Sequence, residues 1–172
     1  MKWSRSELIQ SGNFNVTVDE DTVLPEDAFD GFSLIDGARD VHVSGTGFLD
    51  TDEDRFYADL HITGSMLVMD AISGRQIAVP FETDASETYA FEPVEDEDED
   101  IRVVTDDVID LMPAIRDAIL MEAPLQVTDV DPQDYPSGDG WRVITEEEYE
   151  SSKKNAIDPR LAKLQEFKEG KE

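Results

Sequence analysis

The sequence predicts an α+β fold: a curled antiparallel sheet built as a meander, one helix packed on it after an acidic loop, and a short helical C-terminal tail. Three features predict it. Apolar residues keep period-two spacing from Asp40 to Phe91, which is typical of half-buried strands. An apolar stripe with helical spacing follows residue 110, and the net charge changes sign in the last 23 residues. Closure of the sheet into a barrel is the alternative arrangement of the same strands.

The meander is predicted to contain three to four long strands. Two runs of alternating residues flank the polar tip Asp50–Arg55 and predict a hairpin. Their inward positions are Val41, Val43, Gly45, Gly47 and Leu49 before the tip, and Phe56, Ala58, Leu60, Ile62 and Gly64 after it. The pattern continues in Leu67 and Met69, breaks at Ser73-Gly74, and returns in Ile77, Val79, Phe81, Tyr89 and Phe91. Because glycine weakens a strand interior, the three glycines favour bulges or bends that curl the sheet.

A short helix is predicted before the meander, over Trp3–Gln10. Ser4 and Glu7 have the spacing of a capping box, and the helix is expected to dock through Trp3, Leu8 and Ile9.

Two further elements are predicted before residue 40. Alternation predicts a strand over Asn13–Asp19, ended by the acidic residues that follow. Leu24–Gly37 contains turn-forming residues and is expected to be a loop with a short strand at Phe32–Ile35. The residues expected to anchor this segment are Phe29, Phe32, Leu34 and Ile35.

The packed helix is predicted to follow the meander. The six consecutive acidic residues Glu95–Asp100 repel one another, so we expect a solvated loop there, and Ile101–Thr105 returns to strand-like composition. The helix is predicted from Leu111 to about Met121, with Asp110 as its N-cap and Pro124 after its end. Its predicted buried stripe is Ala114, Ile115, Ala118 and Ile119.

The C-terminal part is predicted to be a separate helical tail. Leu125–Trp141 is rich in turn residues, and Thr145 with Glu148 predicts a second capping box. Asp158 and Pro159 have the positions of an N-cap and a first helical residue, and they predict a terminal helix. We therefore divide the chain into an α+β domain of residues 1–144 and a relatively basic helical tail of residues 145–172.

The tail differs from the body in charge. Six of the 14 basic residues lie in the last 23 positions, where five acidic residues leave a net charge of +1, so the other 149 residues carry −29. One interpretation is that the tail packs its Leu and Phe side chains on the acidic body. The other, which we favour, is that a loosely tethered tail binds a partner protein or RNA. Its predicted partner-binding residues are Asp158, Pro159, Arg160, Leu161, Lys163 and Leu164.

The whole chain is strongly acidic. It has 42 acidic and 14 basic residues and a formal net charge of −28. Such a charge repels DNA, RNA and anionic membranes and favours salt-sensitive association with basic partners. Solubility of an abundant protein, or a saline habitat, explains the same charge without any partner. The aromatic residues that could stack on bases have acidic neighbours, so direct RNA contact is expected only through the tail.

The motifs of common catalytic and metal sites are missing. There is no cysteine and no glycine-rich phosphate loop. Asp50, Asp52 and Asp54 have the spacing of a calcium loop, but Arg55 replaces its glycine and His61 replaces its glutamate. His42 and His61 are interpreted as outward strand residues, because no third ligand is apparent. We predict no catalytic residue, cofactor or metal. Because no apolar leader or run of about 18 apolar residues occurs, we expect a soluble cytoplasmic protein.

Four segments together resemble the YceD family of large ribosomal RNA subunit accumulation proteins, in its low-GC Gram-positive form. They are Met1–Ser4, Ile109–Pro124, Trp141–Tyr149 and the most specific one, Asp158–Leu164. The resemblance implies a bacterial protein that supports large-subunit (23S) rRNA, with genes often beside that of a large-subunit ribosomal protein, and no enzymatic activity or cofactor. Many relatives carry cysteines near positions matching 71–75 and 127–140, where this chain has none, so a thiolate metal site is excluded here.

Taken together, these features predict a non-enzymatic accessory factor for ribosome biogenesis. It would support synthesis, processing or stability of 23S rRNA by binding a basic large-subunit ribosomal protein or a pre-ribosomal particle. Two alternatives remain: a metal-dependent hydrolase or nuclease that uses clustered carboxylates, and an acidic protein-interaction module unrelated to ribosomes.

Overall fold

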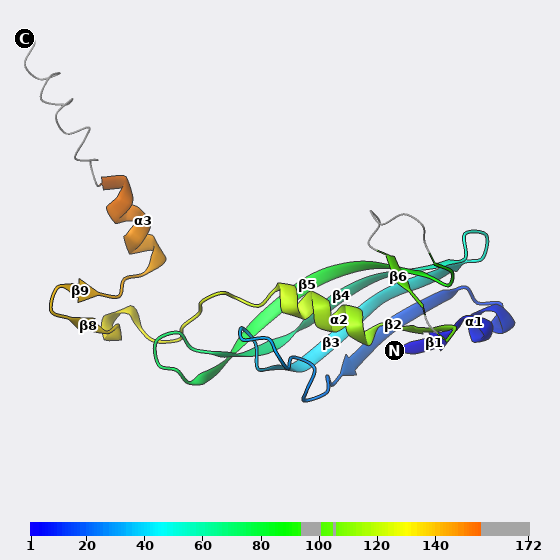
Figure 1. The fold of residues 1–172 in the computed structure, drawn as a ribbon, viewed down its shortest axis with the longest axis horizontal. Coiled ribbons are helices and arrows are strands. Elements are labelled where there is room, and N and C mark those ends of the chain that lie inside the picture. The colour runs from blue at the N-terminus through cyan, green and yellow to red at the C-terminus, as the bar shows by residue number, and fades with distance from the viewer. Residues whose placement is uncertain (94–100, 105, 156–172) are drawn as a thin grey trace, which may run out of the picture. The chain divides into compact units, whose positions relative to one another are not determined.

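The structure is a computed structural model that describes residues 1–93, 101–104 and 106–155 (Figure 1). The chain forms two compact units, Met1–Val127 and Thr128–Glu172, which we describe separately. The predicted tail from residue 145 remains a prediction, because most of it lies outside the described residues. In the described part, no helix is both long and apolar enough to cross a membrane.

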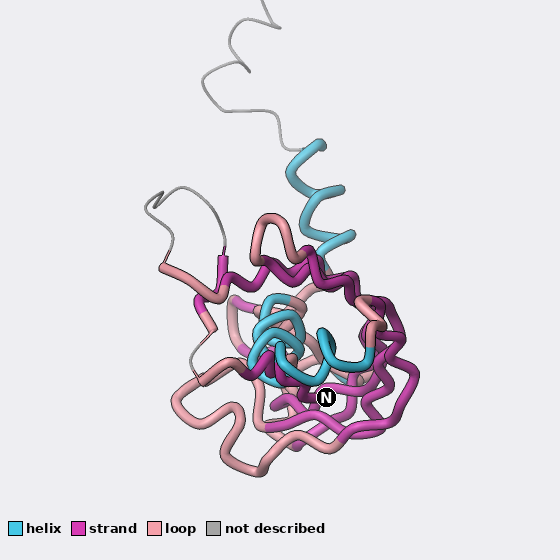
Figure 2. Tube along the Cα trace, turned by 90° about the vertical axis from the view of Figure 1, so that its right-hand side faces the viewer, coloured by secondary structure: helices cyan, strands magenta, loops and turns pink. Residues whose placement is uncertain are grey.

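A five-stranded sheet forms the centre of the first unit. In spatial order its strands are β2 (Asn15–Thr22), β3 (Gly37–Asp50), β4 (Arg55–Met69), β5 (Gln76–Ala90) and β6 (Ile101–Val103). The first four are antiparallel neighbours, which confirms the predicted meander with three long strands, whereas β6 pairs in parallel with the end of β5. The sheet is open, with β2 and β6 as its outer strands, so the barrel alternative is wrong. Figure 2 shows that the sheet nevertheless curls around helix α2 (Met112–Met121).

One face of this sheet is buried and forms the core. Of the predicted inward residues of β3 and β4, Gly45 and Gly64 are partly buried and the others are buried, among them Val43, Phe56 and Ile62, which have no exposed surface. The predicted continuation in Leu67 and Met69 is wrong. Met66 and Val68 are buried instead and Met69 is 52% exposed, because β4 keeps one parity without a break.

The strand glycines leave room for aromatic rings. A Cβ on Gly47 would lie 2.3 Å from Cζ of Phe56, and one on Gly64 would lie 3.0 Å from Cε1 of Phe81. No register shift occurs at Gly47, but a bulge does lie opposite Gly64, because Asp40 and Val41 of β3 together face this one residue of β4. The bulge of β3 lies at Asp40, whose φ is 52°.

The N-terminal helix has the predicted capping box. Helix α1 (Arg5–Ser11) begins after Ser4, whose Oγ accepts from the Glu7 N–H at 3.2 Å, while Oε2 of Glu7 accepts from the Ser4 N–H at 3.0 Å. Leu8 is buried, but Ile9 is 45% exposed and does not dock the helix. An unpredicted two-stranded sheet pairs β1 (Lys2–Ser4) with β7 (Val108–Asp110).

Two predictions in the segment before β3 are wrong. Strand β2 continues to Thr22 instead of ending at Asp19, because it pairs with β3 as far as Val41 and the acidic side chains of this edge strand remain exposed. Residues 32–35 form no strand; Phe29 and Ile35 are buried, but Phe32 and Leu34 are exposed.

Helix α2 packs its predicted stripe against the sheet. Ala114, Ile115 and Ile119 have no exposed surface, and Ala118 is partly buried. The helix begins at Met112 with Leu111 at the N-cap position, so Asp110 is not the N-cap residue as predicted. Its carboxylate still accepts from the Met112 N–H at 3.1 Å and satisfies one of the free donors at the helix start.

The described part of the second unit contains short elements. They are η1 (Pro132–Asp134), the paired strands β8 (Ser137–Gly138) and β9 (Trp141–Arg142), and α3 (Glu146–Asn155). Oγ1 of Thr145 accepts from the Glu148 N–H at 3.1 Å, as its predicted capping role requires. The predicted terminal helix and the acidic run Glu95–Asp100 lie outside the described residues.

Candidate functional site

The predicted partner-binding residues of the tail lie outside the described residues, and that prediction stays untested. They are Asp158, Pro159, Arg160, Leu161, Lys163 and Leu164. The candidate site described here is therefore in the first unit.

A groove of about 680 Å³ lies between β5 and α2. One wall is the run of five consecutive residues 83–87 of β5, and the other includes Asp117, Ala118, Met121 and Glu122 at the end of α2. Consecutive residues of a strand point to opposite faces of the sheet. A cavity that touches all five must therefore lie along the open edge of β5.

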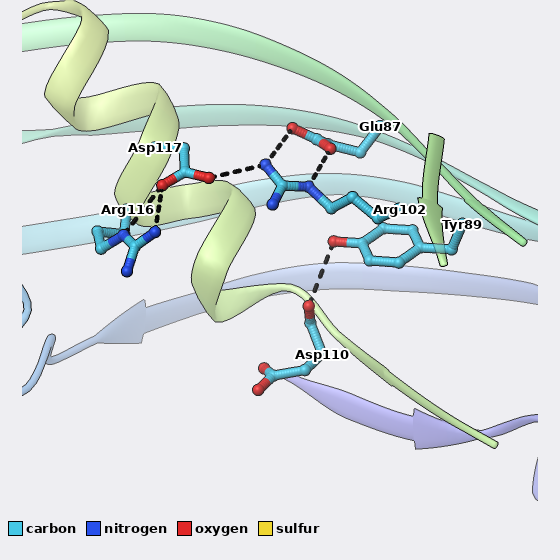
Figure 3. A network of polar contacts seen from close by, with 6 residues as sticks. All are labelled: Glu87, Tyr89, Arg102, Asp110, Arg116 and Asp117. Atoms are coloured by element: carbon cyan, nitrogen blue, oxygen red, sulfur yellow. Dashed lines mark hydrogen bonds and ion pairs between the residues drawn. The ribbon is translucent and has the colours of Figure 1, made fainter. Parts of the chain in front are cut away.

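Arg102 closes one end of this groove and connects three elements (Figure 3). From β6, its Nε donates to Oε2 of Glu87 on β5 at 2.7 Å, and its Nη2 donates to Oδ2 of Asp117 on α2 at 2.9 Å. Arg116 donates to the other oxygen of Asp117 at 2.6 Å. The hydrogen bond to Glu87 and the weaker effect of Asp117 outweigh burial and raise the pKa of Arg102. The network holds β6 and α2 at the end of β5.

The carboxylate and phenol beside Arg102 have shifted pKa values. Burial raises the pKa of Asp117, but hydrogen bonds from Arg116 and Arg102 outweigh burial and leave it below its ordinary value of 3.8. Burial and then the charge of Glu87 raise the pKa of Tyr89 to about 12, and its hydroxyl donates to the Asp110 carbonyl at 3.2 Å. Tyr89 is therefore a neutral core residue at physiological pH, and nothing in this arrangement makes it a general base.

The groove has an excess of negative charge. Its lining contains four carboxylates, from Asp84, Glu87, Asp117 and Glu122, against the single guanidinium of Arg102. This excess favours a cationic ligand over an anionic one.

The outer face of the sheet is acidic as well. The cross-strand register places five carboxylates on this face: Asp19, Asp21, Asp59, Glu82 and Asp84. His42 and His61 lie among them, as their predicted outward orientation requires.

Each of these histidines lies between two carboxylates. His42 contacts Asp21 at 2.8 Å and Asp19 at 3.2 Å, and His61 contacts Asp84 at 2.8 Å. The hydrogen bond that His42 donates to Asp21 raises the pKa of His42 above 6.5, although partial burial opposes this shift. These contacts depend on strand register, which the sequence did not define closely enough to predict.

The acidic residues that the structure describes are not arranged as a metal centre. Among the described residues no group of three or more histidines and carboxylates has metal-binding geometry. In the calcium-like tip, Oδ1 of Asp50 accepts from the backbone N–H groups of Asp52 and Glu53, at 2.9 and 3.1 Å, so this carboxylate shapes the turn.

Sequence reasoning missed the groove because the strand-like composition of Ile101–Thr105 does not reveal which strand this segment pairs with, so no partner of Arg102 could be inferred. One signal was available. Glu87 shares the inward parity of Phe81 and Tyr89, and a carboxylate on the core face of a strand indicates a buried cationic partner.

Known proteins provide an independent line of comparison. The model of the family described as "Large ribosomal RNA subunit accumulation protein YceD" matches residues 58–168, more than half of the chain. YlbN of Bacillus subtilis (strain 168), described as uncharacterized, is 33% identical over 170 residues, covering 96% of this chain and 95% of YlbN. No solved structure matches the chain. The match over most of the β4–α3 region and the similarity along the whole length lead to one conclusion: this chain belongs to the YceD family of large ribosomal RNA subunit accumulation proteins.

Proposed function

We propose that the protein is a non-enzymatic accessory factor of ribosome biogenesis that supports accumulation of 23S rRNA by binding a basic large-subunit ribosomal protein or a pre-ribosomal particle. Family membership supports the ribosomal part of this proposal. The binding mode rests on the charge of the first unit, which is the observation that carries the proposal.

The first unit is a polyanion whose cations are already engaged. Residues 1–127 contain 30 acidic and seven basic side chains, a net charge of −23. Five of the seven basic side chains contact a carboxylate of the same unit: Lys2, Arg5, Arg39, Arg102 and Arg116. Most carboxylates of this unit therefore have no cation of their own to neutralise them, and a basic partner supplies that charge.

The same charge argues against direct RNA binding by the first unit. Binding of RNA gains much of its affinity where lysine and arginine side chains neutralise phosphates and release counterions. Arg160 and Lys163 of the tail are the better candidates for an RNA contact, so RNA would be reached through the tail or through the bound protein.

A pull-down tests the proposal. The immobilised full chain is exposed to bacterial lysate at about 50 mM and about 500 mM salt, with poly-glutamate beads as the control for unspecific polyanion binding. We expect large-subunit proteins or precursors to be enriched over the control at low salt and released at high salt. No enrichment at low salt, or equal enrichment of small-subunit proteins, contradicts the proposal.

A further inference from the structure

We propose that the open edge of β5 binds an extended lysine- and arginine-rich segment of the protein partner by strand addition. This inference rests on the proposed function, because it specifies how the cationic partner is held. Strand addition uses backbone hydrogen bonds for affinity and side-chain contacts for selectivity.

The edge of β5 is blocked at both ends and open between them. Along its whole length β5 pairs with β4 on one side. On the other side β6 pairs only with Thr88–Ala90, and Pro80 interrupts the edge at the opposite end. Within the described part of the chain, no strand pairs with residues 81–87 on that side. This open interval contains all five β5 residues that line the groove.

The direction of the free backbone groups follows from the register. Pro80 has no N–H, and proline in a sheet points its nitrogen away from the neighbouring strand. The carbonyl of Ala90 also points outward, because it accepts from the Val104 N–H at 2.8 Å. The pairing of β4 with β5 has no register shift between Pro80 and Ala90. The backbone N–H and C=O groups of the even-numbered residues therefore point away from β4 along this whole interval. Glu82, Asp84 and Ser86 therefore direct their backbone N–H and C=O groups toward an added strand.

The groove supplies the side-chain contacts for such a strand. At one end Oγ1 of Thr83 donates to Oε1 of Glu122 at 3.0 Å, and at the other Arg102 joins Glu87 to Asp117. Met121 is 87% exposed at the end of α2, beside this space. Thioether side chains adapt to varied apolar surfaces, so alternate residues of an added strand have an apolar contact on one side.

Charge selects a cationic segment. The four carboxylates of the groove outnumber its one guanidinium, which already pairs with two of them. A second copy of the chain, with a net charge of −28, is repelled. The acidic run Glu95–Asp100 has the same unfavourable sign of charge.

Titration of peptides into the full chain tests the inference. The first probe is a blocked peptide in which lysine alternates with valine, long enough to span residues 81–87, followed by calorimetry at about 50 mM salt. Two further probes carry backbone N-methyl groups on all valines or on all lysines, which blocks one hydrogen-bonding edge and keeps the charge. We expect the parent peptide to bind, and at least one methylated peptide to bind about tenfold more weakly.

A protein variant tests the same edge from the other side. Ser86→Pro removes an outward N–H and is expected to weaken binding about tenfold, compared with Ser86→Ala, which removes only the side-chain bond to Asp59. Circular dichroism checks that both variants remain folded, and the methylated peptides test the unmodified protein should Ser86→Pro unfold.

The outcomes separate this inference from the proposed function. If the lysine–valine peptide binds in a salt-sensitive way and neither N-methylation nor Ser86→Pro changes its affinity, strand addition is overturned. The proposed binding of basic partners by the first unit still agrees with that result. Equal binding of a glutamate–valine peptide, or dimerisation of the chain that Ser86→Pro abolishes, also overturns the inference. Failure of the lysate pull-down contradicts the proposed function, whatever the peptides do.

Discussion

Replacement of Arg102 by methionine should lower the free energy of unfolding of the first unit, and the size of this loss should depend on pH. Methionine keeps most of the apolar volume of the arginine side chain but removes the guanidinium that pairs with Glu87. The Glu87 side chain is only 18% exposed, so water replaces this partner poorly. The two-bond contact with Glu87 is the more buried part and is worth about 1–2 kcal/mol. The contact with Asp117 contributes about 0.5 kcal/mol, because both groups are about one third exposed and Arg116 also pairs with Asp117.

Arg116→Met is the matched control. Arg116 pairs with the neighbouring Asp117, and both side chains are more than one third exposed, so we expect a loss of about 0.5 kcal/mol or less. For Arg102→Met, the two contributions add up to a free energy of unfolding about 1.5–2.5 kcal/mol below that of wild type, measured by chemical unfolding at neutral pH. Equal effects of the two substitutions would refute the assignment of Arg102 as the residue that joins β5, β6 and α2.

The effect of Arg102→Met should also depend on pH. The pKa of Asp117 is lowered in the folded protein, so its charged form adds stability above the unfolded-state value near 3.8, and this contribution is lost as the pH falls through the folded-state pKa. The difference between wild type and Arg102→Met should shrink below about pH 4. A difference that stays constant to lower pH contradicts the ionic part of the argument.

Three further predictions concern packing, capping and titration. Gly47→Ala should cost about 1–3 kcal/mol because the new methyl collides with the buried Phe56 ring, whereas Gly37→Ala meets Leu67 at an ordinary 3.6 Å; equal unfolding midpoints would contradict this. Asp110→Ala should cost about 1 kcal/mol by removing the acceptor for the Met112 N–H, and Asp110→Asn should recover most of it in the same assay. The NMR resonance of His42 should titrate with a midpoint above pH 6.5, and a midpoint at or below 6.5 would contradict this. His42→Gln should lower the free energy of unfolding at low pH only, because the contribution of protonated His42 disappears as the pH rises through its raised pKa.

The sequence predicted those parts of the fold that local chemistry determines. The capping box at Ser4, the long strands and the stripe on α2 follow from spacing that each segment carries within itself. Errors arose where a distant partner decides the outcome. Asp110 is displaced from the N-cap position in a segment whose β7 strand pairs with β1. The extent of β2 follows from its pairing with β3 up to Val41.

The groove could be predicted even less well, because it is formed entirely by contacts between segments that are distant in the sequence. Its two walls are 30 or more residues apart in sequence, and Arg102 gains its role only when β6 pairs in parallel with β5. No local sequence pattern predicts that a three-residue strand pairs in parallel with a distant strand. The inward parity of Glu87 was the one available hint, and it identifies a partner charge without saying which residue supplies it.

Sucrose-gradient sedimentation of cell extract, with detection of this protein in every fraction, tests the central claim most directly. At about 50 mM salt we predict that the protein sediments with precursor large-subunit particles and that about 500 mM salt returns it to the top of the gradient. A protein that stays at the top of the gradient at low salt would contradict the account.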